Sequence, residues 1–195
     1  MAEPRKTITV YAGSADHLDP AFTHAAYDLG TAIAAQNRRL VFGTGKTGLM
    51  GAVARGALDH GGEVIGVINE DLNLPCLVFE KLSRIEKVPD IQVRQARMNE
   101  LGDAFIALPG GFGTFYETFE ALTWAQLGHH RKPIGLLNTL GYYDPLVTLI
   151  DHAIENSFIY PEHRGLFVVA DHPLELLEML DSFSPPENMN RWLVR

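Results

Sequence analysis

The chain has 195 residues, a formal net charge of −8 at pH 7, 46% hydrophobic residues and 21% charged residues. This length suffices for one domain with its own hydrophobic core, and the acidic balance argues against a general nucleic-acid binder. No stretch approaches the roughly 18 apolar residues of a membrane span. The start, MAEPRKTITV, lacks the apolar core of a secretory signal, and the single cysteine, Cys76, is typical of a reducing compartment, so we expect a cytoplasmic protein.

Short β-branched or apolar runs alternate along the chain with segments whose apolar residues recur at helical spacing. In chain order they predict strand 6–13, helix 20–37, strand 40–43, helix 48–60, strand 63–69, an irregular segment 70–80, a short strand 83–88, helix 90–102, strand 103–108, helix 114–128, strand 132–138, helix 142–156, strand 166–170 and helix 173–180. This alternation predicts an α/β fold, a Rossmann-like, doubly wound and mostly parallel sheet with helices on both faces. We expect a single domain over residues 1–182 and a C-terminal tail over 183–195.

Three glycine-rich turns follow predicted strands. In an open parallel sheet, ligands bind outside the carboxyl ends of the strands, and glycine lets backbone N–H groups approach an anion at the start of the next helix. The turns therefore indicate a phosphate ligand, although glycines at these places would also serve as tight turns alone. The candidate binding residues are Gly13 and Ser14 in the first turn, Gly43, Thr44 and Gly45 in the second, and Gly110, Gly111, Gly113 and Thr114 in the third.

The second turn allows two other interpretations. Gly43-x-Gly45-x-x-Gly48, with Glu63 further on, matches a dinucleotide-binding fingerprint, but that fingerprint normally occupies the first strand-to-helix turn of its unit. NAD binding therefore remains a minor alternative. Gly45-Lys46-Thr47 is similar to the end of a P-loop, which requires a glycine where this chain has Leu40, and this excludes a P-loop.

The third turn, PGGFGTFYE, places a threonine and a glutamate at the start of a helix. Thr114-x-x-Glu117 has the spacing of a capping box, in which both side chains bond helix N–H groups. A carboxylate in the first turn beside a phosphate-binding loop would also face the sugar of a nucleotide, and both roles are possible together.

Upstream, residues 81–97 hold five basic residues against two acidic ones. Arg94 and Arg97 are one helical turn apart and would share either a ligand-facing or a solvated face.

These motifs together resemble the LONELY GUY family of cytokinin riboside 5′-monophosphate phosphoribohydrolases, whose members were often labelled lysine decarboxylases. The resemblance runs from about Ile8 to Leu180 and rests on Arg94-x-x-x-Met98, DAFIALPGGFGTFYETFEALTWAQLG, KPIGLLN and GYYDPL. It implies a Rossmann-like fold, usually as a homodimer, and hydrolysis of the N-glycosidic bond of a nucleoside 5′-monophosphate to a free base and ribose 5-phosphate. By this resemblance Arg94 and Glu117 match the catalytic pair, and the third turn matches the phosphate-binding loop. We also expect Met98 to contribute to the substrate site.

The implied reaction suits these residue types. Breaking a ribosyl–base bond develops positive charge on the sugar, which a nearby carboxylate such as Glu117 would stabilise while it orients or deprotonates water. The planar guanidinium of Arg94 suits either the phosphate or the departing base. The reaction needs no metal and no redox cofactor. The alternative is a catalytically silent nucleotide-binding or carrier protein on the same fold. A decarboxylase would need a lysine with a supporting site, which neither Lys46 nor Lys132 offers.

The chain departs from the family pattern at several positions. Members commonly carry a lysine at the position of Gln95, a glycine at the position of Thr44 and an acidic residue at the position of Tyr116. Members also tend to carry a glutamate and a histidine near the positions of Cys76 and Phe79. These departures leave the preferred base, a cytokinin or plain adenine, open.

Overall fold

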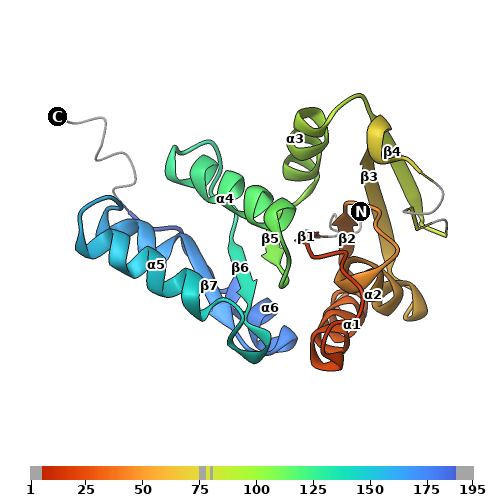
Figure 1. The fold of residues 1–195 in the computed structure, drawn as a ribbon, viewed down its shortest axis with the longest axis horizontal. Helices are drawn as coiled ribbons and strands as arrows, with labels where there is room; N and C mark the ends of the chain where they lie inside the picture. Colours follow the sequence, from red (N-terminus) through yellow and green to blue (C-terminus); the bar gives the residue numbers. More distant parts are fainter. Residues whose placement is uncertain (1–5, 75–77, 80, 188–195) are drawn as a thin grey trace, which may run out of the picture.

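The computed structural model describes residues 6–74, 78–79 and 81–187. A single seven-stranded sheet runs through it in the order β4-β3-β2-β1-β5-β6-β7 (Figure 1). Every neighbouring pair of strands is parallel. The strands are β1 (Thr7–Tyr11), β2 (Arg39–Phe42), β3 (Glu63–Asn69), β4 (Arg84–Val88), β5 (Ala104–Ala107), β6 (Ile134–Leu137) and β7 (Phe167–Ala170).

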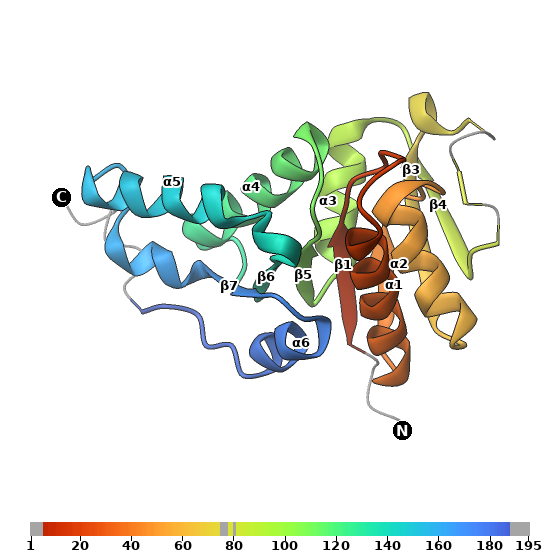
Figure 2. The same cartoon turned by 60° about the horizontal axis from the view of Figure 1, so that its bottom comes forward.

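Helices cover both faces of the sheet. One face packs against α1 (Pro20–Ala35), α2 (Gly48–Asp59) and α6 (Pro173–Asp181), and the other against α3 (Ile91–Leu101), α4 (Phe112–Gln126) and α5 (Asp144–Glu155) (Figure 2). Because side chains alternate along a strand, β1 sends Ile8 and Val10 into the first core and Tyr11 into the second. The fold class predicted from the sequence is confirmed.

Local sequence signals set several helix starts. The Asp19 carboxylate accepts a hydrogen bond from the Ala21 N–H (2.9 Å), and Pro20 occupies the first turn of α1. The Asp90 carboxylate accepts from the Val93 N–H (2.8 Å) and begins α3. The predicted elements are all present with bounds shifted by a few residues, and three short 3₁₀ helices are added, η1 (Glu70–Leu72), η2 (Thr139–Gly141) and η3 (Pro161–Leu166).

The order of the strands reverses between β1 and β5. From β1 the chain adds β2, β3 and β4 on one side and then returns to place β5 on the other. A crevice opens where connections diverge in this way, at the carboxyl ends of the two strands. At this crevice the turn after β1 contacts the turn after β5. The Gly13 N–H donates to the carbonyl of Pro109 (3.1 Å), and a Cβ on Gly13 would lie 3.0 Å from the Gly110 Cα.

The predicted tail, 183–195, lies only in part within the described residues, and Cys76 lies outside them. Within the described part, Pro186 lies against Gly165 of η3. A single domain over 1–182 stays a prediction. None of the helices in the described segments combines the length and the apolarity needed to cross a membrane.

Candidate active site

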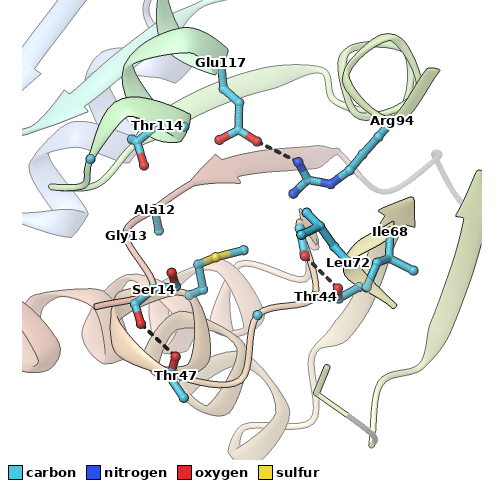
Figure 3. Close-up of a pocket in the computed structure, with 15 residues that line it drawn as sticks. Ala12, Gly13, Ser14, Thr44, Thr47, Ile68, Leu72, Arg94, Thr114 and Glu117 are labelled. Carbon is cyan, nitrogen blue, oxygen red and sulfur yellow. Dashed lines mark hydrogen bonds and ion pairs between the residues drawn. The ribbon is translucent and has the colours of Figure 1, made fainter. Parts of the chain in front are cut away.

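A cavity of about 470 Å³ lies at the carboxyl ends of β1, β2, β3 and β5 (Figure 3). It brings together residues from all three glycine-rich turns with the two charged residues singled out in the sequence. The predicted residues that line it are Gly13, Ser14, Gly43, Thr44, Gly45, Arg94, Gly111, Gly113, Thr114 and Glu117. Segments separated by about a hundred residues in the sequence thus form one pocket.

Arg94 extends from the first turn of α3 into the base of this cavity and is 6% exposed. Its Nε donates to the carbonyl of Val67 on β3 (3.1 Å), and its Nη1 donates to Oε1 of Glu117 (3.2 Å). Two partners on different elements therefore fix the plane of the guanidinium. Removing a charge from water is unfavourable unless it is paired and hydrogen-bonded, and both conditions are met for Arg94.

Gly43 provides the space that Arg94 occupies. A Cβ at this position would lie 1.8 Å from the arginine Nη2 and 3.0 Å from its Cζ. From the sequence, Gly43 was expected to leave room for a phosphate. In the structure, the absence of a side chain at Gly43 leaves room for the guanidinium of Arg94.

Glu117 lies in the second turn of α4 and is 8% exposed. Burial raises the pKa of its carboxyl to about 7, because the charged form loses water, while the positive charge and hydrogen bond of Arg94 act in the opposite direction. A carboxyl group with this pKa exchanges its proton readily at neutral pH, which suits a general acid or base.

The start of α4, residues 111–114, is open at its glycines, and we call it the cradle. Gly111 is the N-cap residue, and a Cβ on Gly111 or Gly113 would meet no atom within 4 Å. The first N–H groups of a helix have no partners within the helix and carry partial positive charge, so this end of α4 suits a phosphate. Beneath it, Gly110 packs so closely on Thr114 that a Cβ would lie 2.1 Å from the threonine Oγ1.

Of the two interpretations of Thr114-x-x-Glu117, the capping box is wrong. The helix begins at Phe112, two residues earlier than predicted, and no side chain caps it. Both residues therefore lie inside the helix, where Thr114 is buried against Gly110 and Glu117 faces Arg94. Glycine is a favoured residue at the N-cap even though it has no side chain to cap the helix.

Three other expectations need correction. Gly110 does not line the main cavity but a neighbouring one of about 340 Å³, where its carbonyl accepts from the hydroxyl of Tyr142. Met98 is fully buried in the core between α3 and the sheet and does not reach the cavity. Arg94 and Arg97 do not share a ligand-facing side of α3: Arg94 reaches the cavity, whereas Arg97 binds Glu86 of β4 through Nε (2.6 Å).

Met50, Ile68 and Leu72 form an apolar wall of the cavity that was not expected from the sequence. Ile68 could have been found from its place near the end of a strand. Leu72 lies in the segment expected to be irregular, and Met50 gave no signal beyond its proximity to Gly48. Figure 3 shows Ile68 and Leu72 on the same side of Glu117 as Arg94, and Thr114 on the opposite side.

Among the described residues, no group of three or more histidine, cysteine or carboxylate side chains is arranged to hold a metal ion.

A family model and several curated proteins match most of this chain. Residues 50–180 match the family model described as possible lysine decarboxylase. A probable cytokinin riboside 5′-monophosphate phosphoribohydrolase of Oryza sativa subsp. japonica is 44% identical over 180 residues, covering 92% of this chain and 72% of the relative. A cytokinin riboside 5′-monophosphate phosphoribohydrolase of Arabidopsis thaliana is 44% identical over 181 residues, covering 92% of this chain and 83% of the relative.

Solved structures resemble the fold at lower identity. The molybdenum cofactor binding protein of Rippkaea orientalis superposes with a TM-score of 0.70 at 22% identity, covering 93% of this chain and 98% of the other. The molybdenum cofactor carrier protein of Chlamydomonas reinhardtii gives a TM-score of 0.68 at 20% identity, covering 92% and 98%. At these identities the likeness supports the Rossmann-like architecture alone.

Proposed function

Because this chain belongs to the family described as possible lysine decarboxylase, whose curated relatives are named cytokinin riboside 5′-monophosphate phosphoribohydrolases, we propose that it hydrolyses the N-glycosidic bond of a purine or cytokinin nucleoside 5′-monophosphate. The products are the free base and ribose 5-phosphate. One observation carries the proposal: the Arg94–Glu117 pair faces the same cavity as the open N-terminus of α4.

The layout of the cavity matches the order of parts in a nucleotide. We place the phosphate on the cradle at Gly111, Gly113 and Thr114, the ribose beside Glu117, and the base against the apolar wall. Figure 3 supports this order, because Glu117 lies between Thr114 and Arg94. Of the two roles that the sequence left open for Arg94, this placement favours the base end.

In the proposed reaction the C1′–N bond breaks and its electron pair leaves with the base. Glu117, as a carboxylate, stabilises the positive charge that develops on the ribose, and it accepts a proton from the water whose oxygen bonds to C1′. That proton is then available to the departing base, so the reaction balances without a metal or a redox cofactor. Arg94 orients the Glu117 carboxylate and lies near the negative charge that forms on the base.

The family description suggests a different activity, which the cavity does not favour. A pyridoxal-dependent decarboxylase needs a lysine for its Schiff base, and no lysine is among the described residues that line the cavity. A silent nucleotide carrier is less well supported than the hydrolase, because a carrier has no use for a carboxyl group buried beside the ribose position with a pKa near neutrality.

The test is to incubate the purified chain with adenosine 5′-monophosphate and with isopentenyladenosine 5′-monophosphate, and to quantify free base and ribose 5-phosphate. We expect both products in equal amounts from at least one substrate, and the ratio of the two rates reports base preference. Tight binding of both nucleotides with no base released would support the carrier and contradict the hydrolase.

We further propose that the chain acts as a homodimer in the cytoplasm. An exposed apolar face on α4 supports the first part: Phe112, Tyr116 and Phe119 are 92%, 46% and 42% exposed and recur at helical spacing. A face of this kind on a helix is typical of a contact with a partner. The single cysteine supports the second part.

A further inference from the structure

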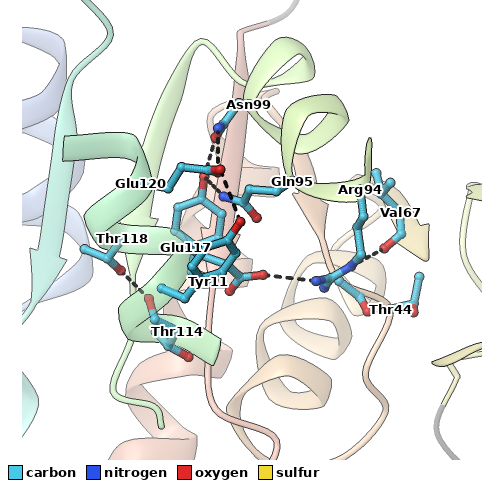
Figure 4. Close-up of polar contacts among 12 residues, drawn as sticks. Tyr11, Thr44, Val67, Arg94, Gln95, Asn99, Thr114, Glu117, Thr118 and Glu120 are labelled. Atoms are coloured by element: carbon cyan, nitrogen blue, oxygen red, sulfur yellow. Dashed lines mark hydrogen bonds and ion pairs between the residues drawn. The ribbon is translucent and has the colours of Figure 1, made fainter. Parts of the chain in front are cut away.

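A second group of polar side chains lies behind Glu117, on the side away from the cavity and between β1, α3 and α4 (Figure 4). The Tyr11 hydroxyl donates to Oδ1 of Asn99 (2.7 Å), and Nδ2 of Asn99 donates to Oε2 of Glu120 (3.3 Å). Lys132 donates to the carbonyl of Asn99 (2.6 Å) and so holds that residue in place. We call this group the Gln95 cluster; it consists of Tyr11, Gln95, Asn99 and Glu120.

The charges around the two glutamates do not balance. Glu120 lies one helical turn after Glu117, and Arg94 is the cation that faces Glu117 from α3. From β1 the facing titratable group is Tyr11, and from α4 it is Tyr116, whose hydroxyl donates to Glu120 (3.3 Å). Within the described residues, no cation lies within ion-pair distance of Glu120. With both carboxyl groups ionised and one guanidinium, the site carries one uncompensated negative charge, shared between the buried Glu117 and the half-buried Glu120.

Gln95 is the unusual member of the cluster. It is fully buried, its Nε2 lies 3.4 Å from the Tyr11 hydroxyl, and its amide is also within hydrogen-bond reach of Glu120. Its Oε1 is buried and has no hydrogen-bond donor among the described residues. A buried amide oxygen without a donor is unfavourable, and a protonated carboxyl group is a donor whereas a carboxylate is not.

An amide can serve either protonation state of a neighbouring carboxyl group. By rotating half a turn about its last torsion angle, Gln95 presents either its NH₂ group to a carboxylate or its oxygen to a protonated carboxyl. A lysine at this position would bond the carboxylate alone, and a methionine would bond neither form. The residue at 95 therefore decides whether this cluster can hold a proton.

Building on the proposed hydrolase function, we propose that Glu117 and Glu120 share one proton at neutral pH, and that Gln95 is the positioning residue that allows this by bonding Glu120 in either state. Burial raises the pKa of both carboxyl groups, and the charge of Glu120 further raises the pKa of Glu117, in agreement with this arrangement. Glu117 then accepts the proton of the attacking water more readily than an isolated, ion-paired glutamate would.

The test is the pH dependence of kcat/KM for base release from adenosine 5′-monophosphate by the full chain. Glu120→Gln removes the second negative charge and keeps the shape, and Gln95→Lys adds a positive charge at the same place. We expect each to move the acid limb of the profile down by about one pH unit or more. Gln92→Lys, an exposed site on the same helix, adds the same charge away from the cluster and should leave the limb where the unmodified chain has it.

An acid limb of Glu120→Gln that coincides with that of the unmodified chain would overturn the proposal, even if Gln95→Lys fails to fold. A second measurement separates this failure from failure of the proposed function. Proton uptake on folding, obtained without substrate from the pH dependence of the unfolding free energy, should be larger in the unmodified chain than the summed uptakes of Glu117→Gln and Glu120→Gln, because each carboxyl group alone holds the proton less well. If no base is released but this difference is present, the hydrolase proposal fails and proton sharing stands. An uptake in the unmodified chain equal to that sum would reject proton sharing.

Discussion

The Arg94 guanidinium donates a hydrogen bond to the Glu117 carboxylate across 3.2 Å and so joins α3 to α4 beneath the cavity. Both residues are more than nine-tenths buried. A buried ion pair of this kind contributes little net stability, because desolvation of two charges offsets most of their attraction. Its value lies in orientation: the carboxylate is held in one position relative to the open end of α4, where we place the phosphate of the substrate.

Glu117→Gln should abolish turnover and leave the fold intact. The amide has the size of the carboxylate, but it can neither stabilise positive charge on the ribose as well nor accept a proton from water. We expect base release to fall by about 100-fold or more. The assay is free-base production, with circular dichroism as the control for folding. Activity within a few-fold of the unmodified chain would reject Glu117 as the reacting carboxylate.

Gly43→Ala should displace Arg94. The new methyl group would lie 1.8 Å from Nη2, so the guanidinium must move and release Glu117. Misplacing a catalytic group by about 1 Å is enough to lower the rate by roughly 100-fold. Because Arg94 lies away from the cradle, binding of ribose 5-phosphate, measured by calorimetry, should change little. Loss of both activity and ribose 5-phosphate binding would show that Gly43 belongs to the cradle after all.

The fold could be predicted from the sequence because each strand ends in a turn signal and each helix shows its own apolar periodicity. The same regularity located the cavity, since Gly13, Gly43 and Gly111 all follow strands of one parallel sheet. The LONELY GUY resemblance added the pairing of Arg94 with Glu117, which no local pattern contains.

Two features could not be predicted from the sequence: which side of a helix faces the cavity, and which residues far apart in the chain come into contact. Arg94 and Arg97 carry the same charge one turn apart, yet Arg94 points into the cavity and Arg97 binds Glu86 of β4. Which of the two faces inward depends on how α3 lies on the sheet, and local spacing does not encode that. The Gln95 cluster likewise gathers residues from β1, α3 and α4, and its members were not expected to meet.

Stability should decrease with rising pH because of Glu117. Folding raises the pKa of this carboxyl from 4.5 to about 7 by burial, so the folded chain binds more protons than the unfolded chain within that interval. The stabilising contribution is complete below the lower value and is lost as the pH rises through the higher one. Between about pH 5 and pH 8 we expect the unmodified chain to lose about 2–3 kcal/mol of unfolding free energy relative to Glu117→Gln. Urea titrations at several pH values measure both, and parallel curves would contradict the raised pKa.

Thr44→Gly should stabilise the chain. Thr44 has a φ of +67°, a left-handed conformation that is unfavourable for a β-branched residue. Its Cγ2 also packs close to Gly66, where an added Cβ would lie 2.3 Å away. Relief of backbone strain, less the lost packing and the greater chain entropy of glycine, should raise the unfolding free energy by about 1 kcal/mol.

Thr47→Gly is the matched control for this change, because it lies in the same turn and has a φ of −107°. There glycine relieves no strain and removes the hydrogen bond from the threonine hydroxyl to the carbonyl of Ser14 (2.7 Å), so we expect a loss of about 1 kcal/mol. Both variants are compared by urea denaturation. A loss of stability in Thr44→Gly equal to that in Thr47→Gly would mean that the left-handed turn carries no strain.

Phe119→Glu should dissociate the proposed homodimer. Phe119 shares the exposed face of α4 with Phe112 and Tyr116, and a carboxylate buried there in both copies would repel its counterpart and lose its water. Phe158→Glu is the matched control, since Phe158 is 87% exposed and follows α5 rather than belonging to α4. Sedimentation velocity should show a dimer for the unmodified chain and for Phe158→Glu, and a monomer for Phe119→Glu. A dimer that survives Phe119→Glu but not Phe158→Glu would move the interface from α4 to the segment after α5.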